Sequence, residues 1–160
     1  MSKTNLDPRI AEFCERLEGL DSGEQARLKR NAGRSMSDSH QVLGLFFRVL
    51  PTNVPRFQEE DYFLLATLYA LANGGAEGNL GDTLRKVRDP KYAQGLDRRV
   101  EFLLDADHDE LPFRLRQAIR FVESQRGSVN WPQLLRDVLA WEHPERYVQE
   151  NWARAYFVGQ

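Results

Sequence analysis

Residues 109–127, DELPFRLRQAIRFVESQRG, contain the pattern that decides the fold class. Their apolar residues recur every three or four positions, at Leu111, Leu115, Ala118, Ile119 and Val122. This spacing places them on one side of an α-helix, which we expect to begin near Asp109 and to end near Gly127. Similar spacing recurs along the chain, whereas stretches that alternate apolar and polar residues are nearly absent. The sequence therefore predicts an all-α fold.

Signals for helix starts and stops predict seven or eight short helices. Ser22 and Gln25 have the spacing of a capping box, and they predict a second helix that ends near Gly33. Asp38 is expected to cap a third helix that runs to Leu50. That helix is apolar on nearly all sides, so we expect it to be buried.

The length and the glycine distribution predict how the helices are grouped. A chain of 160 residues has the size of one domain, which we assign to residues 1–160. A glycine-rich segment, residues 73–81, is expected to be a flexible connector. It separates two helical groups, at about 7–72 and 82–158, that we expect to pack together in one bundle.

Composition excludes several classes of protein. The single cysteine, Cys14, excludes a disulfide scaffold and fits a reducing cytoplasm, where we expect the protein to act. Its position among the apolar residues of the first helix favours a buried structural role. No apolar run has the roughly 18 residues that a membrane span needs, so no membrane contact is expected.

Three motifs that suggest a ligand fail on closer reading. Gly75, Gly78 and Gly81 follow a helix and lack the Gly-Lys-Ser/Thr of a phosphate loop. Asp105, Asp107 and Asp109 have the spacing of the first ligands of a calcium loop. The glycine required at the sixth position of such a loop and the glutamate required at the twelfth are both missing. The three histidines share no metal-ligand spacing with Cys14. We therefore predict no metal, no cofactor and no catalytic activity.

The basic residues carry more information than the formal net charge of −2. Arginine outnumbers lysine by 18 to 4, which favours phosphate contacts or interface ion pairs, although a GC-rich genome produces the same excess. Two stretches concentrate the cations: residues 27–34 and residues 112–136. At helical spacing, Arg116 and Arg120 lie opposite the apolar side, with Phe113 between them.

These patterns leave two hypotheses open. One is a nucleic-acid-binding or scaffold module without catalytic activity, and the other is a helical enzyme or adaptor with an unrecognised site. An ordinary solvated helix surface also explains the arginines. Phosphate binding predicts a steep loss of affinity with salt, with a slope near −0.7 per neutralised charge on a single strand.

An ordered set of short matches then suggests a family. It comprises GLDRRVEFLLDAD at 95–107, NWPQLLRD at 130–137 with Trp141, LKR at 28–30, FFRVLP at 46–51, and NLG at 79–81. Together they resemble the CasB small subunit of the type I-E CRISPR interference complex, Cascade. The resemblance extends in order over nearly the whole chain.

The resemblance implies a small helical protein without enzymatic activity. Two copies of such a subunit pack beside the other Cascade subunits. Their basic surface supports the guide RNA, the target DNA paired to it, and the displaced DNA strand. This role agrees with RNA-guided recognition in general, in which base pairing reads the sequence and protein contacts the backbone.

The resemblance also implies a set of nucleic-acid-binding residues. These are Lys29, Arg30, Arg56, Arg98, Arg99, Arg116, Arg120, Arg136 and Arg146, the last within the final helix that begins at Pro144. Arg34 is added for its spacing from Arg30, whereas Arg48 is left out because it falls in the helix expected to be buried. Arg99 has an alternative role, as an ion-pair partner of Asp105 or Asp107.

A second reading of the arginines remains open. They could make ion pairs between subunits in a protein–protein scaffold, with no nucleic-acid contact. The slightly negative net charge indicates weak binding by the isolated chain and useful binding only where contacts from several subunits add.

Overall fold

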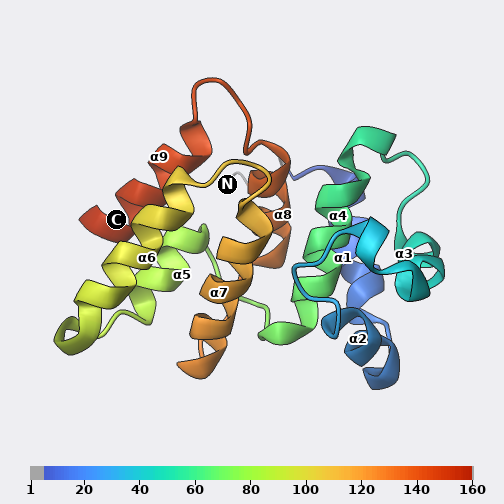
Figure 1. Cartoon of the computed structure of the whole chain (residues 1–160), viewed down its shortest axis with the longest axis horizontal. Coiled ribbons are helices and arrows are strands. Elements are labelled where there is room, and N and C mark those ends of the chain that lie inside the picture. Colours follow the sequence, from blue (N-terminus) through green and yellow to red (C-terminus); the bar gives the residue numbers. More distant parts are fainter. Residues whose placement is uncertain (1–5, 160) are drawn as a thin grey trace.

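The computed structural model describes residues 6–159 and confirms the all-α prediction. Within these residues there is no strand, only an isolated bridge between Asn73 and Ser128. Residues 6–159 contain nine α-helices, and short 3₁₀ turns lie in the connections from α2 to α6 (Figure 1). They are α1 (Pro8–Glu18), α2 (Ser22–Lys29), α3 (Leu43–Val49), α4 (Glu59–Leu68), α5 (Leu80–Lys86), α6 (Ala93–Asp105), α7 (Leu111–Ser124), α8 (Trp131–Leu139) and α9 (Tyr147–Ala153). A π-helical turn, Arg154–Val158, continues α9.

The helices form two groups at opposite ends of the molecule, with two further helices between them. Figure 1 shows α1 to α4 at one end and α5, α6 and α9 at the other, with α7 and α8 between them. α8 contacts both α1 and α4, and α7 contacts α4, α5 and α6. One hydrophobic cluster runs through both ends. The assignment of residues 1–160 to a single domain stays a prediction, since residues 1–5 and 160 lie outside the described part.

α4 is the central helix of the first end. Every residue from Tyr62 to Leu68 is buried, so this helix is covered on all sides. Phe13 from α1 and Phe46 from α3 pack against it, with T-shaped ring contacts to Tyr62 and Phe63 at about 5 Å. Such edge-to-face pairs add to the energy of apolar burial. No helix of the described chain is long and apolar enough to span a membrane.

Two expected helix starts are wrong. The N-cap of α2 is Asp21, whose carboxylate accepts from the N–H of Glu24 at 2.7 Å, while Glu24 reaches back to the N–H of Asp21. Asp21 has the extended backbone that a cap needs, and Ser22 already lies within the helix. The third helix begins at Leu43, because two 3₁₀ turns occupy residues 36–42. The residue expected to cap it, Asp38, lies in the first of these turns.

The glycine-rich segment is only partly a connector. Asn79 and Asp82 form a reciprocal capping box, so α5 begins at Leu80 and includes Gly81. Gly81 is buried against α9, where a Cβ would lie 2.2 Å from the carbonyl oxygen of Trp152. Glycine therefore serves close packing at this position.

Candidate nucleic-acid interface

Three cations from distant parts of the chain line one groove of about 600 Å³. Lys29 comes from the end of α2, while Arg120 and Arg126 come from the last turns of α7 and the residues after it. Ala70 and Leu71 of the 3₁₀ turn η5 (Tyr69–Leu71) line it as well, together with the two residues that follow the turn. Glu123 is the only carboxylate in the lining. We call this feature the basic groove.

Packing and backbone geometry bring these cations together. α2 and α7 both contact η5, which holds the two helices on either side of it. Arg120 follows the fully buried Ile119 and points outward. Arg126 has a left-handed backbone, with φ of 61°, just beyond the end of α7. The next residue is Gly127, which packs tightly against Val87 and Val122. A Cβ added to this glycine would lie only 2.9 Å from side-chain atoms of both valines.

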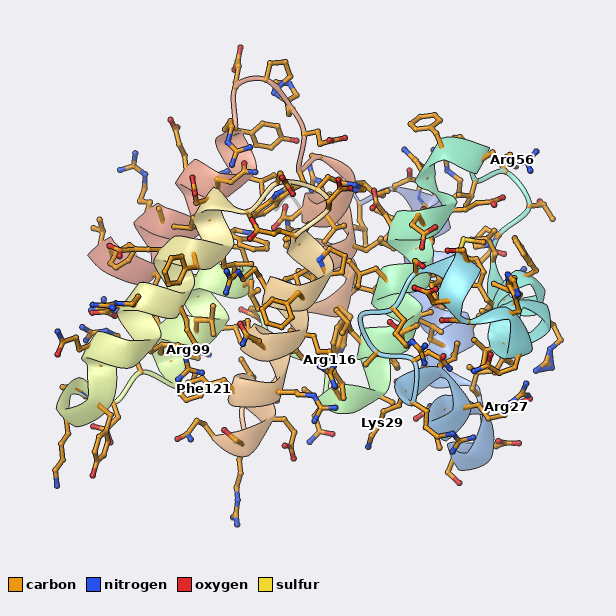
Figure 2. The ribbon with its side chains drawn as sticks, in the orientation of Figure 1. Arg27, Lys29, Arg56, Arg99, Arg116 and Phe121 are labelled. Carbon is orange, nitrogen blue, oxygen red and sulfur yellow. The ribbon has the colours of Figure 1, made fainter. Side chains whose placement is uncertain are left out.

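Arg116 lies beside the basic groove and is partly buried. It packs against Gly33, which has a left-handed φ of 78°. A Cβ added to this glycine would lie 3.0 Å from the Cδ of Arg116. The stem of Arg116 therefore packs across the chain after α2, and its Nε has no hydrogen-bond partner among the described residues. Figure 2 shows Arg116 and Lys29 on the facing sides of α7 and α2. Arg116 thus has a packing role as well as a charge.

The cations of the basic groove are not neutralised within the described chain. Lys29, Arg120 and Arg126 make no ion pair with any carboxylate of residues 6–159. Arg88 is different, because both oxygens of Asp97 accept from it at 3.0 and 3.1 Å. That guanidinium, helped by Tyr156, lowers the pKa of Asp97. Unpaired arginines suit phosphate oxygens, which accept from the planar guanidinium in pairs.

Arg99 and Arg98 lie on α6, on the other side of α7. The guanidinium of Arg99 is 5.1 Å from the ring centre of Phe121, a cation–π contact between α6 and α7 (Figure 2). Arg99 makes no ion pair with Asp105 or Asp107, so the alternative suggested by the sequence is wrong. Arg98 is exposed on the same helix.

The remaining predicted residues do not join the basic groove. Arg30 caps the end of α2 and is exposed. Arg34 lies outside that helix, because α2 ends at Lys29, and it lines a separate groove with several carboxylates. Figure 2 shows Arg56, in the 3₁₀ turn Arg56–Gln58, at the far edge from Lys29.

The last two predicted residues lie on α8 and before α9. Arg136 is exposed on α8. Arg146 precedes α9 rather than lying within it, because the helix begins at Tyr147 and not at Pro144. Its backbone is left-handed, with φ of 54°, and its guanidinium donates to the carbonyl of Leu104 at 3.1 Å. The ten predicted residues therefore occupy several surfaces, and their role stays a prediction.

Two further arginines lie elsewhere than the sequence suggested. Arg126 belongs to the cation-rich segment but is absent from the predicted set, and the turn after α7 places it in the lining of the basic groove. Arg48 was left out as buried, yet it is exposed, and its guanidinium donates to Glu24 at 2.6 Å. The error arose because α3 is short and buries only one side.

Groups that could hold a metal or act as a nucleophile have unfavourable surroundings. No cluster of three or more His, Cys, Asp and Glu side chains within residues 6–159 could hold a metal ion. Burial raises the pKa of the Cys14 thiol to about 12. Cys14 is therefore a protonated thiol at neutral pH. The sequence led us to expect a buried cysteine, but Cys14 is partly rather than fully buried against the core.

Comparison with known proteins identifies the family. Residues 24–157 match the family model for CRISPR-associated protein Cse2. A CRISPR-associated protein Cse2 of Thermus thermophilus is 43% identical over 103 residues, which is 62% of this chain but only 57% of that protein. Crystal structures of CasB from Thermus thermophilus and from M. ruber are each 29% identical.

The structural overlap is nearly complete. The Thermus thermophilus CasB structure has a TM-score of 0.79, with 94% of this chain and 97% of that chain covered. For M. ruber CasB the TM-score is 0.77, with 94% and 93% covered. A chain of a structure described as a CRISPR RNA-guided surveillance complex shares the fold at 22% identity, with a TM-score of 0.79 over 94% and 92%. Since the family model spans most of its length, the chain belongs to the Cse2/CasB family of CRISPR-associated proteins, as the resemblance predicted.

Proposed function

We propose that this chain is a non-catalytic small subunit of a CRISPR RNA-guided surveillance complex. Its basic groove holds the nucleic-acid backbone while the guide RNA pairs with target DNA and the other DNA strand is displaced. Its partners are the other subunits, a second copy of itself, the guide RNA and the target DNA. The family assignment and the fold shared with a chain of such a complex support this role.

The convergence of Lys29, Arg120 and Arg126 on one groove is the observation that carries the proposal. Three cations face one carboxylate there, in a chain whose formal net charge is −2. The groove is therefore positively charged although the chain as a whole is slightly negative, and phosphate binding requires a positive charge. Three phosphate contacts give modest affinity by themselves, so binding gains strength when neighbouring subunits hold the same strands.

The test replaces the three groove cations together. Lys29→Ala/Arg120→Ala/Arg126→Ala, hereafter the triple groove variant, removes the charges and leaves the helix cores unchanged, because all three side chains extend from the surface. Two quantities are measured in the purified complex: co-elution of the chain with guide RNA and other subunits, and the lifetime of the guide RNA–target DNA hybrid. We expect normal co-elution and a shorter lifetime.

The control is Arg154→Ala, which removes an exposed cation from the π-helical turn outside the basic groove. It should change neither quantity. If the triple groove variant fails to assemble, the arginines make subunit contacts, and the protein–protein scaffold is the correct reading. If hybrid lifetime and assembly both match those of the unaltered chain, the basic groove has no role in holding nucleic acid.

A further inference from the structure

A second groove of the described chain has the opposite electrostatic character. It measures about 930 Å³ and lies between α1, the start of α8 and the segment after η5. Glu15 and Glu18 of α1 line it, and no lysine or arginine does. Its apolar wall includes Cys14, Tyr69 and Trp131. We call it the acidic groove, and its carboxylates repel the phosphates that suit the basic groove.

The backbone along one side of the acidic groove is available for pairing. Asn73 uses its carbonyl to accept from the N–H of Val129 at 2.8 Å. Gly74, Gly75 and Ala76, which come next, make no backbone hydrogen bond to any other residue from 6 to 159. Gly75 has φ of 97° and open space at its Cβ position. Unpaired backbone groups beside a groove are the feature that an extended peptide recognises.

A buried donor in the same wall also lacks a partner. Trp131 is 2% exposed, and its indole Nε1 has no acceptor among the described residues. The edge of the indole faces Gly74, where a Cβ would lie 3.1 Å from Cδ1 and 3.7 Å from Nε1. The donor is covered in this structure, so an occupant would reach it only if the backbone at Gly74 moved aside. Unpaired buried donors are rare in proteins.

We propose that the acidic groove binds an extended, basic segment of a neighbouring protein in the assembled complex. A lysine or arginine of that segment pairs with Glu15 and Glu18, while an apolar side chain packs against Tyr69 and Trp131. The backbone of the segment pairs with residues 74–76. This proposal rests on the proposed function in one respect: the partner is another protein of the surveillance complex.

The shared wall makes the two grooves neighbours. Ala72 and Asn73 line both of them, so the segment after η5 has carboxylates on one side and cations on the other. A protein segment in the acidic groove would therefore hold the chain in place beside nucleic acid in the basic groove. This arrangement accounts for a small subunit whose net charge is slightly negative.

The first experiment identifies the occupant. A photo-crosslinking benzoylphenylalanine replaces Ala76, which lines the groove, and the assembled complex is purified before irradiation. Mass spectrometry should find one crosslinked protein segment of another subunit that contains lysine or arginine. A crosslink to nucleic acid, to residues 1–5 of this chain, or to no partner overturns the proposal.

The second experiment tests the charges. Glu15→Arg should weaken retention of the chain in the complex about tenfold or more, because like charges then face each other. Replacing the basic residue of the crosslinked segment by glutamate should restore it. The control, Glu145→Arg, makes the same charge change at an exposed residue outside the groove and should leave retention unchanged. Unfolding in urea confirms that both variants fold.

The two proposals can fail separately. Normal retention of Glu15→Arg in a complex that still binds nucleic acid overturns only the role of the acidic groove. A complex that retains the chain through the acidic groove but shows no loss with the triple groove variant overturns only the role of the basic groove.

Discussion

Gly81→Ala should destabilise the protein, against the usual preference of helices for alanine. In an ordinary helix, alanine is more stable than glycine by roughly 0.5–1 kcal/mol. Here the added Cβ would lie 2.2 Å from the backbone carbonyl oxygen of Trp152, whereas real contacts essentially never fall below 3.0 Å. The obstacle is backbone, so α5 and α9 must separate by at least 0.8 Å along this line.

The expected loss follows from overpacking. Forcing additional atoms into a packed core costs typically about 1–3 kcal/mol, which exceeds the gain in helix propensity. The contact also holds α5 against α9 and the π-helical turn, the most extensive packing at this end of the molecule. For a protein of this size, each kcal/mol lowers Tm by roughly 2–4 °C.

The measurement is urea unfolding followed by tryptophan fluorescence, with Tm from calorimetry. Gly95→Ala is the matched control, because Gly95 lies in α6 with no atom within 4 Å of its Cβ position. That variant should gain roughly 0.5–1 kcal/mol, the ordinary helix preference. A Gly81→Ala protein as stable as the unaltered chain, or more stable, would refute the close-packing argument.

Other outcomes concern salt, a buried hydrogen bond and pH. The triple groove variant should flatten the plot of log affinity against log salt by about 2, since each lost single-strand contact contributes ~0.7, and an unchanged slope would contradict phosphate contact. Trp152→Phe removes the donor that bonds the buried Asp137 carboxylate at 2.8 Å, and should cost about 1–3 kcal/mol in urea unfolding. A cost near zero would mean that another group takes over that bond. Burial lowers the pKa of His108, but the Asp61 carboxylate, bonded at 2.8 Å, and the nearby Glu142 and Asp109 together raise it, so the net shift is upward. The stability that protonation of His108 contributes is thus present just below pH 6.5 and is lost as pH rises through the raised pKa. His108→Gln should remove that decline in a series of unfolding curves from pH 5.5 to about 8.5, and a decline of equal size in the variant would assign it to another group.

Helix identity was predictable because it depends on local periodicity. The apolar spacing of α7 predicted that five residues face the core. Four of them are buried and Ala118 is partly buried. Helix ends were less predictable, because a cap depends on backbone angles as well as residue type. Ser22 has a suitable side chain, but the preceding residue has the extended backbone and the bond.

The role of a glycine was also hard to predict from local sequence. A run of glycines indicates a flexible connector when only sequence is known. Gly81 instead lies inside α5, because helix α9 approaches so closely that no side chain fits. That requirement comes from a residue far along the chain, and no local pattern carries it.

The sequence by itself determined the helical fold class, the family and the presence of cation-rich stretches. Each depends on residue type and spacing within one segment. Only the tertiary structure decided which cations act together, because Lys29 and Arg120 meet through the packing of α2 and α7 on η5. It also separated them from Arg56 and placed two carboxylates of α1 in a groove of their own. Charge is a property of residues, but an electrostatic surface depends on contacts between segments distant in the chain, which only folding specifies.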